Sequence, residues 1–365
     1  MNKNNKTIFI AGGGTGGHLF PAVAIGKTLE ERGINVFYIG SKNGIEKKYF
    51  NQHNLKHFLL NISGIQRNLN IKSILKNLTF PIKFIISYIK SVFLILKYKP
   101  KAIVGTGGYC SGLPLIAGIT LKIPTFIQDQ NSIPGLITRT LHNKIDNIFL
   151  GYKNASKHLN KDKCIFSGNP VREDLIILDK KLSKNKLNFN PTKKLLFIIG
   201  GSQGAKPIND YFLKNYKNYI SQGYQILLQC GEKNIENFNE VNNPDIKIVR
   251  FIDNISLAYS ASDIVISRAG ALAISELCIM KKAIILIPFP QAAENHQKIN
   301  AEYLQNQNAC KIIYQNELKS HKLLELVKQL FKNESEIKKL EKNSTKISKK
   351  DSTKVITDKI IEHMI

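Results

Sequence analysis

The 365-residue sequence contains no tryptophan, three methionines and five cysteines. The cysteines are Cys110, Cys164, Cys230, Cys278 and Cys310. They lie far apart, with no C-x-x-C pair and no histidine at zinc spacing, so the pattern predicts neither a disulfide framework nor a zinc site. We expect free, buried thiols in a reducing cytoplasm.

Long hydrophobic runs are also missing. No uninterrupted apolar stretch approaches the roughly 18 to 20 residues that a bilayer-spanning helix needs. Residues 1–6 precede the first predicted strand and contain no apolar signal region or cleavage site. We therefore expect a protein that stays in the cytoplasm and does not cross the membrane.

Acidic residues are scarce: 27 Asp and Glu stand against 53 Lys and Arg, a formal net charge of +26. Such an excess favours a partner that carries phosphates, such as nucleic acid, anionic lipid or a nucleotide. However, the cations are mostly lysines spread along the whole chain, which favours compositional drift for most of the charge. Motifs of RNA and DNA binding are absent, so no nucleic-acid partner is expected.

Short apolar strands alternate with helical stretches, the pattern of parallel sheets covered by helices. The predicted strands are residues 7–11, 35–39, 102–105, 125–128 and 147–150, then 194–199, 225–229, 247–250, 264–267 and 283–287. The pattern restarts after Gly168-Asn169-Pro170, and the length suits two domains. The sequence predicts an α/β fold of two Rossmann-like, doubly wound lobes with a cleft between them.

A glycine-rich turn follows an early strand of each lobe, at residues 12–17 and 200–204. The first turn, before a helix predicted to begin near Pro21, presents backbone N–H groups to an anion. Thr15 and His18 add a hydroxyl and an imidazole to it. Because ligands bind at the carboxyl ends of parallel strands, this edge of the sheet is a candidate site.

The same turn also matches the dinucleotide fingerprint, through Gly12, Gly14 and Gly17. A bound NAD needs an acidic residue at the end of the second strand, and residues 39–42 read Ile-Gly-Ser-Lys. The sequence therefore disfavours an NAD-linked oxidoreductase.

Further motifs follow in order. They are Phe20-Pro21, residues 105–109, Gln130-Asn131, residues 168–172, residues 200–205, residues 267–271, Ser275-Glu276, residues 295–297 and Asn300-Ala301. This set covers nearly the whole chain and resembles the MurG family, the transferases that add N-acetylglucosamine to undecaprenyl-diphospho-N-acetylmuramoyl-pentapeptide (lipid I) in peptidoglycan synthesis. The resemblance implies a GT-B fold and inverting, β-1,4-forming transfer from UDP-N-acetylglucosamine.

The resemblance also implies a division of the chain. Residues 1–168, with a C-terminal helix at about 350–365, form the acceptor and membrane-facing lobe, and residues 169–349 form the UDP-sugar lobe. The implied partners are UDP-N-acetylglucosamine, the undecaprenyl-linked acceptor, the anionic inner leaflet of the plasma membrane and other cell-wall synthesis proteins. The resemblance implies a peripheral protein at the cytoplasmic face of that membrane. No cofactor is expected, and because a D-x-D motif is lacking, no metal.

Several residues of the second lobe are candidate donor ligands. Glu276 can accept hydrogen bonds from both ribose hydroxyls, or it can complement a helix dipole. Arg172 can bind the diphosphate or hold the interdomain junction, and Ser202 adds a hydroxyl beside the second glycine turn. By resemblance alone, the backbone of Ile252 meets the uracil. Further implied ligands are Ala271, Leu272, Ala273, Ile274 and Ser275.

Gln297 is predicted to bind sugar hydroxyls, although amides also crosslink loops. Its neighbour Asn300 is interpreted as stabilising its helix.

For the base, His18 is favoured because an unperturbed imidazole titrates near pH 6.5, and Asp129 is the rival. Thr15, Gly16, Gly17 and Asn131 are expected to contact the transferred sugar and the acceptor. The sequence departs from the family where the usual His-Glu reads Gln128-Asp129 and where a usual histidine is Gln291, which weakens the case for Asp129.

Other segments carry structural expectations. In residues 71–99, Pro81 should break the helix. The segment before and around Pro81 is predicted to meet an anionic bilayer through Ile74, Leu75, Leu78 and Phe80. The helix after Pro81 is expected to pack on the sheet. Residues 178–194 read as a surface loop, and the chain from Asn333 onward as terminal helices.

Two alternatives remain open. One is another GT-B enzyme that glycosylates a lipid, such as a diacylglycerol galactosyltransferase. The other is a non-catalytic homologue that binds a UDP-sugar, suggested by the altered Gln128 and Asp129.

Overall fold

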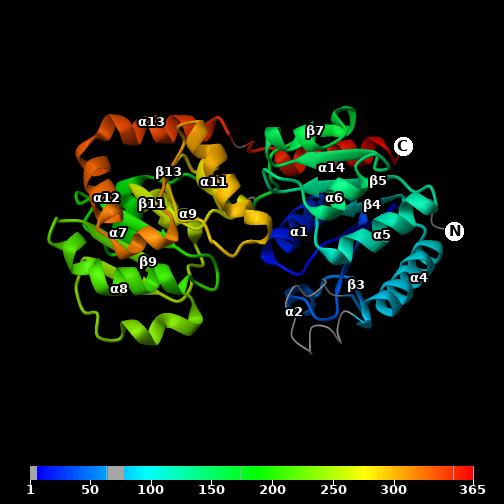
Figure 1. Cartoon of the computed structure of the whole chain (residues 1–365), viewed down its shortest axis with the longest axis horizontal. Helices are drawn as coiled ribbons and strands as arrows, with labels where there is room; N and C mark the ends of the chain where they lie inside the picture. The colour runs from blue at the N-terminus through cyan, green and yellow to red at the C-terminus, as the bar shows by residue number, and fades with distance from the viewer. Residues whose placement is uncertain (1–5, 63, 65–77, 173, 348, 365) are drawn as a thin grey trace. The chain divides into compact units, whose positions relative to one another are not determined.

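The computed structural model describes residues 6–62, 64, 78–172, 174–347 and 349–364. The chain forms two compact units, Met1–Val171 with Lys350–Ile365, and Arg172–Lys349. Each unit is built on a parallel β-sheet flanked by helices (Figure 1). The two-lobed α/β prediction is therefore confirmed.

The first unit contains a seven-stranded sheet in the order β3-β2-β1-β4-β5-β6-β7. Its strands are β1 (Thr7–Ala11), β2 (Asn35–Ser41), β3 (His57–Leu60), β4 (Ala102–Gly105), β5 (Thr125–Asp129), β6 (Asn147–Leu150) and β7 (Cys164–Phe166). The buried apolar runs of the inner strands made them predictable. The edge strands β3 and β7 were not predicted, because they are short and mostly only half-buried.

Alternate residues of these strands face opposite sides of the sheet. Phe9 packs on one side with helices α4 (Phe80–Tyr98) and α5 (Tyr109–Thr120). Ile8 packs on the other side with α1 (Gly16–Glu31) and the C-terminal α14 (Ser352–Glu362), which lie side by side in Figure 1. Two further helices, α2 (Ile45–Gln52) and α6 (Leu136–Leu141), complete this unit.

The second unit contains a six-stranded sheet in the order β10-β9-β8-β11-β12-β13. Its strands are β8 (Leu195–Ile199), β9 (Gln225–Gln229), β10 (Ile246–Val249), β11 (Ile264–Ser267), β12 (Ala283–Leu286) and β13 (Lys311–Ile312). Its helices are α7 (Lys180–Lys186), α8 (Lys206–Ile220), α9 (Ile255–Ala261), α10 (Ala271–Ile279), α11 (His296–Asn306), α12 (Lys322–Lys332) and α13 (Glu334–Thr345). The last of these begins after Asn333, as the sequence predicts.

Helix α7 corrects the prediction of a loop over residues 178–194. Asp179 Oδ1 accepts a hydrogen bond from Leu182 N at 2.8 Å and thereby caps the helix. Lys184 is buried and its Nζ lies 2.9 Å from Asp263 Oδ2. A helix that buries a paired lysine has no apolar periodicity, so the pattern of residue types did not reveal it.

Helix α1 begins at Gly16, earlier than the predicted start near Pro21, which lies inside it. The missing N–H of Pro21 deprives one backbone carbonyl, that of Gly17, of its helical partner. Because Gly17 is exposed, water can reach that carbonyl. The earlier start places His18 in the first turn of α1.

Helix α4 begins at the expected break, with Pro81 in its first turn. One side packs in the core through Ser87, Ser91, Leu94 and Ile95. The opposite side, which we call the α4 apolar face, is exposed to solvent. It consists of Ile82, Ile85, Ile86, Ile89, Phe93 and Leu96, with the exposed Leu78 just before the helix.

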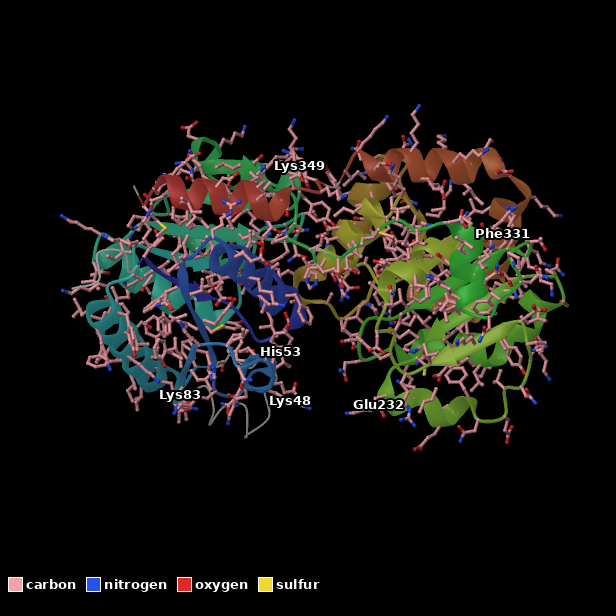
Figure 2. The ribbon with its side chains drawn as sticks, turned by 180° about the vertical axis from the view of Figure 1, so that it is seen from behind. Lys48, His53, Lys83, Glu232, Phe331 and Lys349 are labelled. Atoms are coloured by element: carbon pink, nitrogen blue, oxygen red, sulfur yellow. The ribbon has the colours of Figure 1, made fainter. Side chains whose placement is uncertain are left out.

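The expectation that this helix packs on the sheet is confirmed for its core-facing side, and the structure adds that its outward side is apolar. Figure 2 labels Lys83, which follows Ile82 in the first turn of α4. Phe80 is half-buried against the core, and Ile74 and Leu75 lie outside the described residues. In the described part of the chain, no helix is both long and apolar enough to cross a membrane.

Lys282, directly before β12, is a buried lysine whose ammonium donates to two backbone carbonyls, Tyr259 O at 2.9 Å and Ser262 O at 3.0 Å. Burial lowers its pKa to about 8. A lysine of an unfolded chain titrates near 10.4. Between these pH values the unfolded state binds more protons than the folded state, so Lys282 makes the free energy of unfolding rise with pH. Below pH 8 the folded state bears the full free-energy cost of burying the charged ammonium.

We therefore expect Lys282→Met to flatten the pH dependence of unfolding between about pH 8 and about pH 10. The slope of the unfolding free energy should change by up to about 1.4 kcal/mol per pH unit relative to the unsubstituted chain. Urea denaturation across this range measures it. Lys338→Met, at a lysine that is 72% exposed, is the control. Equal slopes for the Lys282 variant and the unsubstituted chain would contradict the assignment.

Candidate active site

The carboxyl ends of β1, β4 and β5 bring three loops of the first unit together. Ala11 pairs with Gly105 on β4, and Gly105 pairs with Ile127 on β5. The loops that follow therefore lie at one edge of the sheet, as expected for a parallel sheet. Thr15 and Gly17 at the start of α1 are exposed there, and Gly16 is half-buried.

His18 is held by the loop that follows β4. Its Nδ1 lies 3.0 Å from Thr106 O and 3.2 Å from Gln130 Oε1. Thr106 Oγ1 in turn donates to His18 O at 2.7 Å. Gly107 has a φ of +98°, and a Cβ there would lie 2.4 Å from His18 Nδ1. The ring is thus fixed against a backbone segment that only glycine can provide.

Glu46 is a buried carboxylate that we did not predict. It accepts hydrogen bonds from Gly14 N at 2.8 Å and from Ser41 N at 2.7 Å. A Cβ at Gly13 would lie 2.3 Å from its Cδ, and one at Gly44 would lie 2.2 Å from its Oε1. The glycines therefore leave room for an internal anion. The first turn was expected to offer its backbone N–H groups to a ligand. Gly14 N donates to Glu46 instead, so the expectation is wrong for Gly14.

The acid Glu46 follows Gly40 and Gly44, and this spacing is the signal that could have revealed it.

Asp129, the rival base, ends β5 and is buried. Its carboxylate accepts hydrogen bonds from Thr138 Oγ1 at 2.6 Å, Gly135 N at 2.9 Å and Asn131 N at 3.3 Å. Burial raises its pKa, and these hydrogen bonds oppose the rise. The geometry lets Asp129 tie the loop before α6 to the end of β5 and places Asn131 in that loop.

In the second unit, Glu276 and Arg172 come together. Glu276 Oε1 lies 3.3 Å from Arg172 Nε, and Tyr259 Oη donates to its Oε2 at 3.2 Å. Burial raises the pKa of Glu276 and Arg172 opposes the rise. Glu276 lies in the second turn of α10, beyond the first turn where an acid complements the helix dipole. That alternative interpretation is therefore wrong.

The first turn of α10 provides the backbone of the predicted 271–275 segment. Residues Ala271, Leu272 and Ala273 carry N–H groups that have no intrahelical acceptor in a helix of this geometry. Ile274 is buried in the core, and Ser275 Oγ donates back to Ala271 O at 3.0 Å. These last two side chains support the helix.

The second glycine turn is held by Gln229, at the end of β9, a residue that we did not predict. Its Nε2 donates to Gly201 O at 3.1 Å and its Oε1 accepts from Ile252 N at 3.0 Å. It therefore links the turn that carries the exposed Ser202 to the segment predicted to meet the uracil. Gly204 has a φ of +73°, and a Cβ there would lie 1.8 Å from Cys230 O.

Gln297 is half-buried, and its Oε1 accepts a hydrogen bond from Phe289 N at 3.0 Å. Asn300 is buried and donates to Ala269 O at 3.3 Å, so it ties α11 to the loop before α10. Gln291 is exposed in the loop after β12.

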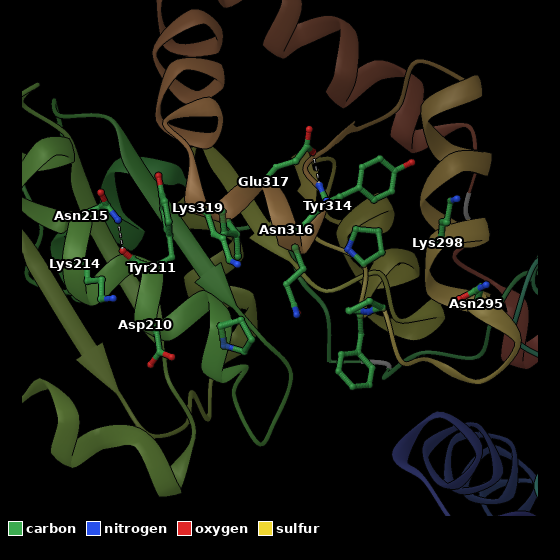
Figure 3. A pocket seen from close by; sticks show the side chains of 16 residues that line it. Asp210, Tyr211, Lys214, Asn215, Asn295, Lys298, Tyr314, Asn316, Glu317 and Lys319 are labelled. Atoms are coloured by element: carbon green, nitrogen blue, oxygen red, sulfur yellow. Dashed lines mark hydrogen bonds between the residues drawn. The ribbon is translucent and has the colours of Figure 1, made fainter. Parts of the chain in front are cut away.

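A cavity of about 1130 Å³ opens nearby, between α8, the loop after β12 and the segment 314–319 (Figure 3). Lys214 reaches it from α8 and Lys298 from α11. Among the described residues, its lining includes Phe289 but not Ser202, Glu276 or Gln297. The cavity is thus adjacent to the predicted donor residues and separate from them.

Comparison with known proteins decides the family. Residues 8–150 match the glycosyltransferase family 28 N-terminal domain, and residues 195–357 match the family's C-terminal domain. A relative from Flavobacterium psychrophilum, named UDP-N-acetylglucosamine–N-acetylmuramyl-(pentapeptide) pyrophosphoryl-undecaprenol N-acetylglucosamine transferase, is 37% identical over 97% of this chain and 96% of its own. The chain belongs to the MurG family.

A second MurG-family relative, from Cytophaga hutchinsonii and of the same name, is 36% identical over 97% of this chain and 96% of its own. The fold agrees as well. The crystal structure of Acinetobacter baumannii MurG has a TM-score of 0.79 to this chain, at 24% identity, and covers 98% of this chain and 99% of that one. The MurG-family resemblance and the GT-B fold predicted from the sequence are confirmed.

Proposed function

We propose how this chain carries out the reaction of its family and which residues take part. The chain is a UDP-N-acetylglucosamine-dependent glycosyltransferase. It transfers N-acetylglucosamine to lipid I with inversion and forms lipid II in peptidoglycan synthesis. The observation that carries this function is the family membership over 97% of the chain.

The second unit binds the donor. Glu276 accepts hydrogen bonds from the ribose hydroxyls while Arg172 holds its carboxylate in place. Since Ile252 N already donates to Gln229, the uracil meets the carbonyl of Ile252. Since Gln297 Oε1 already accepts from Phe289 N, its NH₂ group is the part that donates to the sugar.

The N-terminus of α10 and the hydroxyl of Ser202 receive the donor diphosphate. An acceptor hydroxyl attacks the anomeric carbon, its oxygen forms the new bond, and the bond from that carbon to the UDP oxygen breaks. UDP leaves with the electron pair, and its charge is stabilised by the helix N-terminus and by Arg172. The proton of the acceptor hydroxyl passes to His18.

Asp129 serves to hold the loop that carries Asn131, in line with its three hydrogen bonds. Thr15, Gly16, Gly17 and Asn131 contact the acceptor.

Crossed substrates test the assignment. The purified chain is supplied with UDP-N-acetylglucosamine or UDP-galactose, and with a lipid I analogue or diacylglycerol. We expect product only from UDP-N-acetylglucosamine with the lipid I analogue. Galactosylation of diacylglycerol would identify the alternative lipid glycosyltransferase. Donor binding without turnover of any pair would identify a non-catalytic homologue.

We also propose that the α4 apolar face docks this unit peripherally on the cytoplasmic side of an anionic membrane. Its exposed side chains lie at helical spacings along one side of α4. Lys83, Lys97 and Lys99 lie on or beside the helix and match the charge of anionic lipid headgroups. The acceptor is itself a membrane lipid, which supports a location at the bilayer surface.

Replacing Ile82, Ile89 and Phe93 by serine is expected to weaken binding to anionic phospholipid vesicles by more than about 10-fold, because three apolar side chains no longer enter the interface. Sedimentation with the vesicles measures this. Turnover of a short-chain, water-soluble acceptor should stay unchanged. The matched control replaces Ile176, Ile177 and Leu182, which are exposed apolar residues of the second unit. Unchanged vesicle binding of the α4 variant would contradict the proposal.

A further inference from the structure

A closed network of buried amide side chains lies behind His18. Gln128, Gln130 and Asn169 are each at most 2% exposed. Gln130 Nε2 donates to Gln128 Oε1 at 2.6 Å, and Gln128 Nε2 donates to Asn169 Oδ1 at 3.1 Å. The network brings together the ends of β4 and β5 and the segment after β7.

Backbone carbonyls at both ends determine which way each amide points, because a carbonyl oxygen can only accept. At one end, Asn169 Nδ2 donates to Gln130 O at 3.0 Å. At the other end, Gln130 Nε2 donates to Thr106 O at 2.7 Å. With both ends fixed, the Oε1 of Gln130 has to face the ring of His18.

His18 Nδ1 therefore has two acceptors within reach, Thr106 O at 3.0 Å and Gln130 Oε1 at 3.2 Å. A nitrogen between two acceptors carries the ring proton, so the neutral imidazole has its lone pair on Nε2. That nitrogen is the one able to accept a proton.

We propose that Gln130 is a positioning residue, which fixes the tautomer and the orientation of the His18 ring so that Nε2 receives the proton of the acceptor hydroxyl. This inference rests on the proposed role of His18 as the base. Gln128 and Asn169 act through Gln130 by setting the direction of its amide. Asn169 is itself confined, because a Cβ at Gly151 would lie 2.1 Å from its Oδ1.

The network is built of neutral groups. Asp129 is an ionisable group that interacts electrostatically with His18, and its carboxylate is engaged by Thr138 and Gly135. Gln130 thus orients the ring without placing a negative charge against Nδ1. A carboxylate at this position would favour the charged imidazolium, which cannot act as a base.

Nitrogen NMR of the imidazole, with selectively labelled histidine in the full chain, reports the tautomer directly. We expect the wild-type His18 to carry its proton on Nδ1. In Gln130→Leu only Thr106 O remains as an acceptor for Nδ1, so we expect a smaller share of the Nδ1-protonated form than in the wild type. A wild-type ring protonated on Nε2 would overturn the proposal. Because this readout does not require turnover, it separates the positioning of the ring from the role of His18 in catalysis.

Kinetics give the second readout. Gln130→Leu is expected to lower kcat about 10-fold with the KM for UDP-N-acetylglucosamine unchanged. Gln130→Glu, which keeps the shape, should move the acid limb of the pH–rate profile up by about one pH unit. Gln225→Leu, a buried glutamine in the second unit, is the matched control and should leave the acid limb in place. An unchanged kcat in Gln130→Leu and an unmoved acid limb in Gln130→Glu would overturn the proposal.

Discussion

Replacing His18 with asparagine is expected to lower kcat by about 10²- to 10⁴-fold, the range that a positioned general base contributes. Asparagine can still donate from its side chain to Thr106 O, so the loop after β4 keeps a partner. Its amide cannot take up the proton of the acceptor hydroxyl. Steady-state turnover of a lipid I analogue measures the loss.

The donor should still bind the His18 variant, because the proposed contacts to UDP all come from the second unit. We expect a UDP-N-acetylglucosamine affinity within about twofold of the wild type in calorimetry, a change of less than about 0.5 kcal/mol. His158→Asn, at an exposed histidine of the first unit, is the matched control and should keep full turnover. A His18→Asn enzyme with wild-type kcat would remove this residue from the mechanism.

Replacing Glu276 with glutamine is expected to weaken donor binding by about 10- to 100-fold. A hydrogen bond to a charged group contributes about 1.5 to 3 kcal/mol, and the carboxylate is the proposed acceptor for both ribose hydroxyls. An amide offers one oxygen and leaves Arg172 without its ionic partner. The KM for UDP-N-acetylglucosamine and the dissociation constant of UDP both measure the effect.

The control for Glu276 is Glu334→Gln, an exposed glutamate of the same unit that pairs with Lys338. It should leave donor binding unchanged. Because 2′-deoxy-UDP lacks one of the two ribose hydroxyls of UDP, the Glu276 variant should also discriminate less between these two nucleotides. An unchanged donor KM in Glu276→Gln would show that the ribose is bound elsewhere.

The inner strands could be predicted because each is a short, fully buried apolar run bounded by glycine or polar residues. β1 and β8 are examples, with nearly all of their side chains inaccessible to solvent. Their carboxyl ends placed the glycine turns at the sheet edges. The same reasoning misses β3 and β7, since a short, half-buried edge strand has neither the burial nor the alternation that marks a strand.

Candidate site residues could be predicted from motifs, but their hydrogen-bond partners could not. The sequence places His18 and Glu276 among the candidates, and neither Thr106 nor Tyr259 is close to its partner in the sequence. Glu46 and Gln229 escaped prediction for the same reason, because each acts through backbone N–H and C=O groups that only the folded loops bring within reach.

The predictions of local structure were wrong where specific contacts stabilise a structure that the residue composition does not indicate. Helix α7 forms in a lysine-rich stretch because Asp179 caps it and Asp263 neutralises a buried lysine. The face of α4 away from the core is apolar and exposed, which composition alone cannot distinguish from a buried face.

The departure at Gln128 is also explained by its place in the fold. Gln128 lies on β5 within the buried amide network, so a glutamine there supports the ring of His18 rather than contacting a substrate.

The central claim, transfer of N-acetylglucosamine to lipid I, is tested most directly by following the sugar itself. The purified chain is incubated with UDP-N-acetylglucosamine labelled in the sugar and with a lipid I analogue, and the label is then divided between lipid product and free sugar. We predict that the label appears in a lipid product with one added β-linked N-acetylglucosamine. Release of the label as free N-acetylglucosamine, with no glycosylated lipid, would contradict the account.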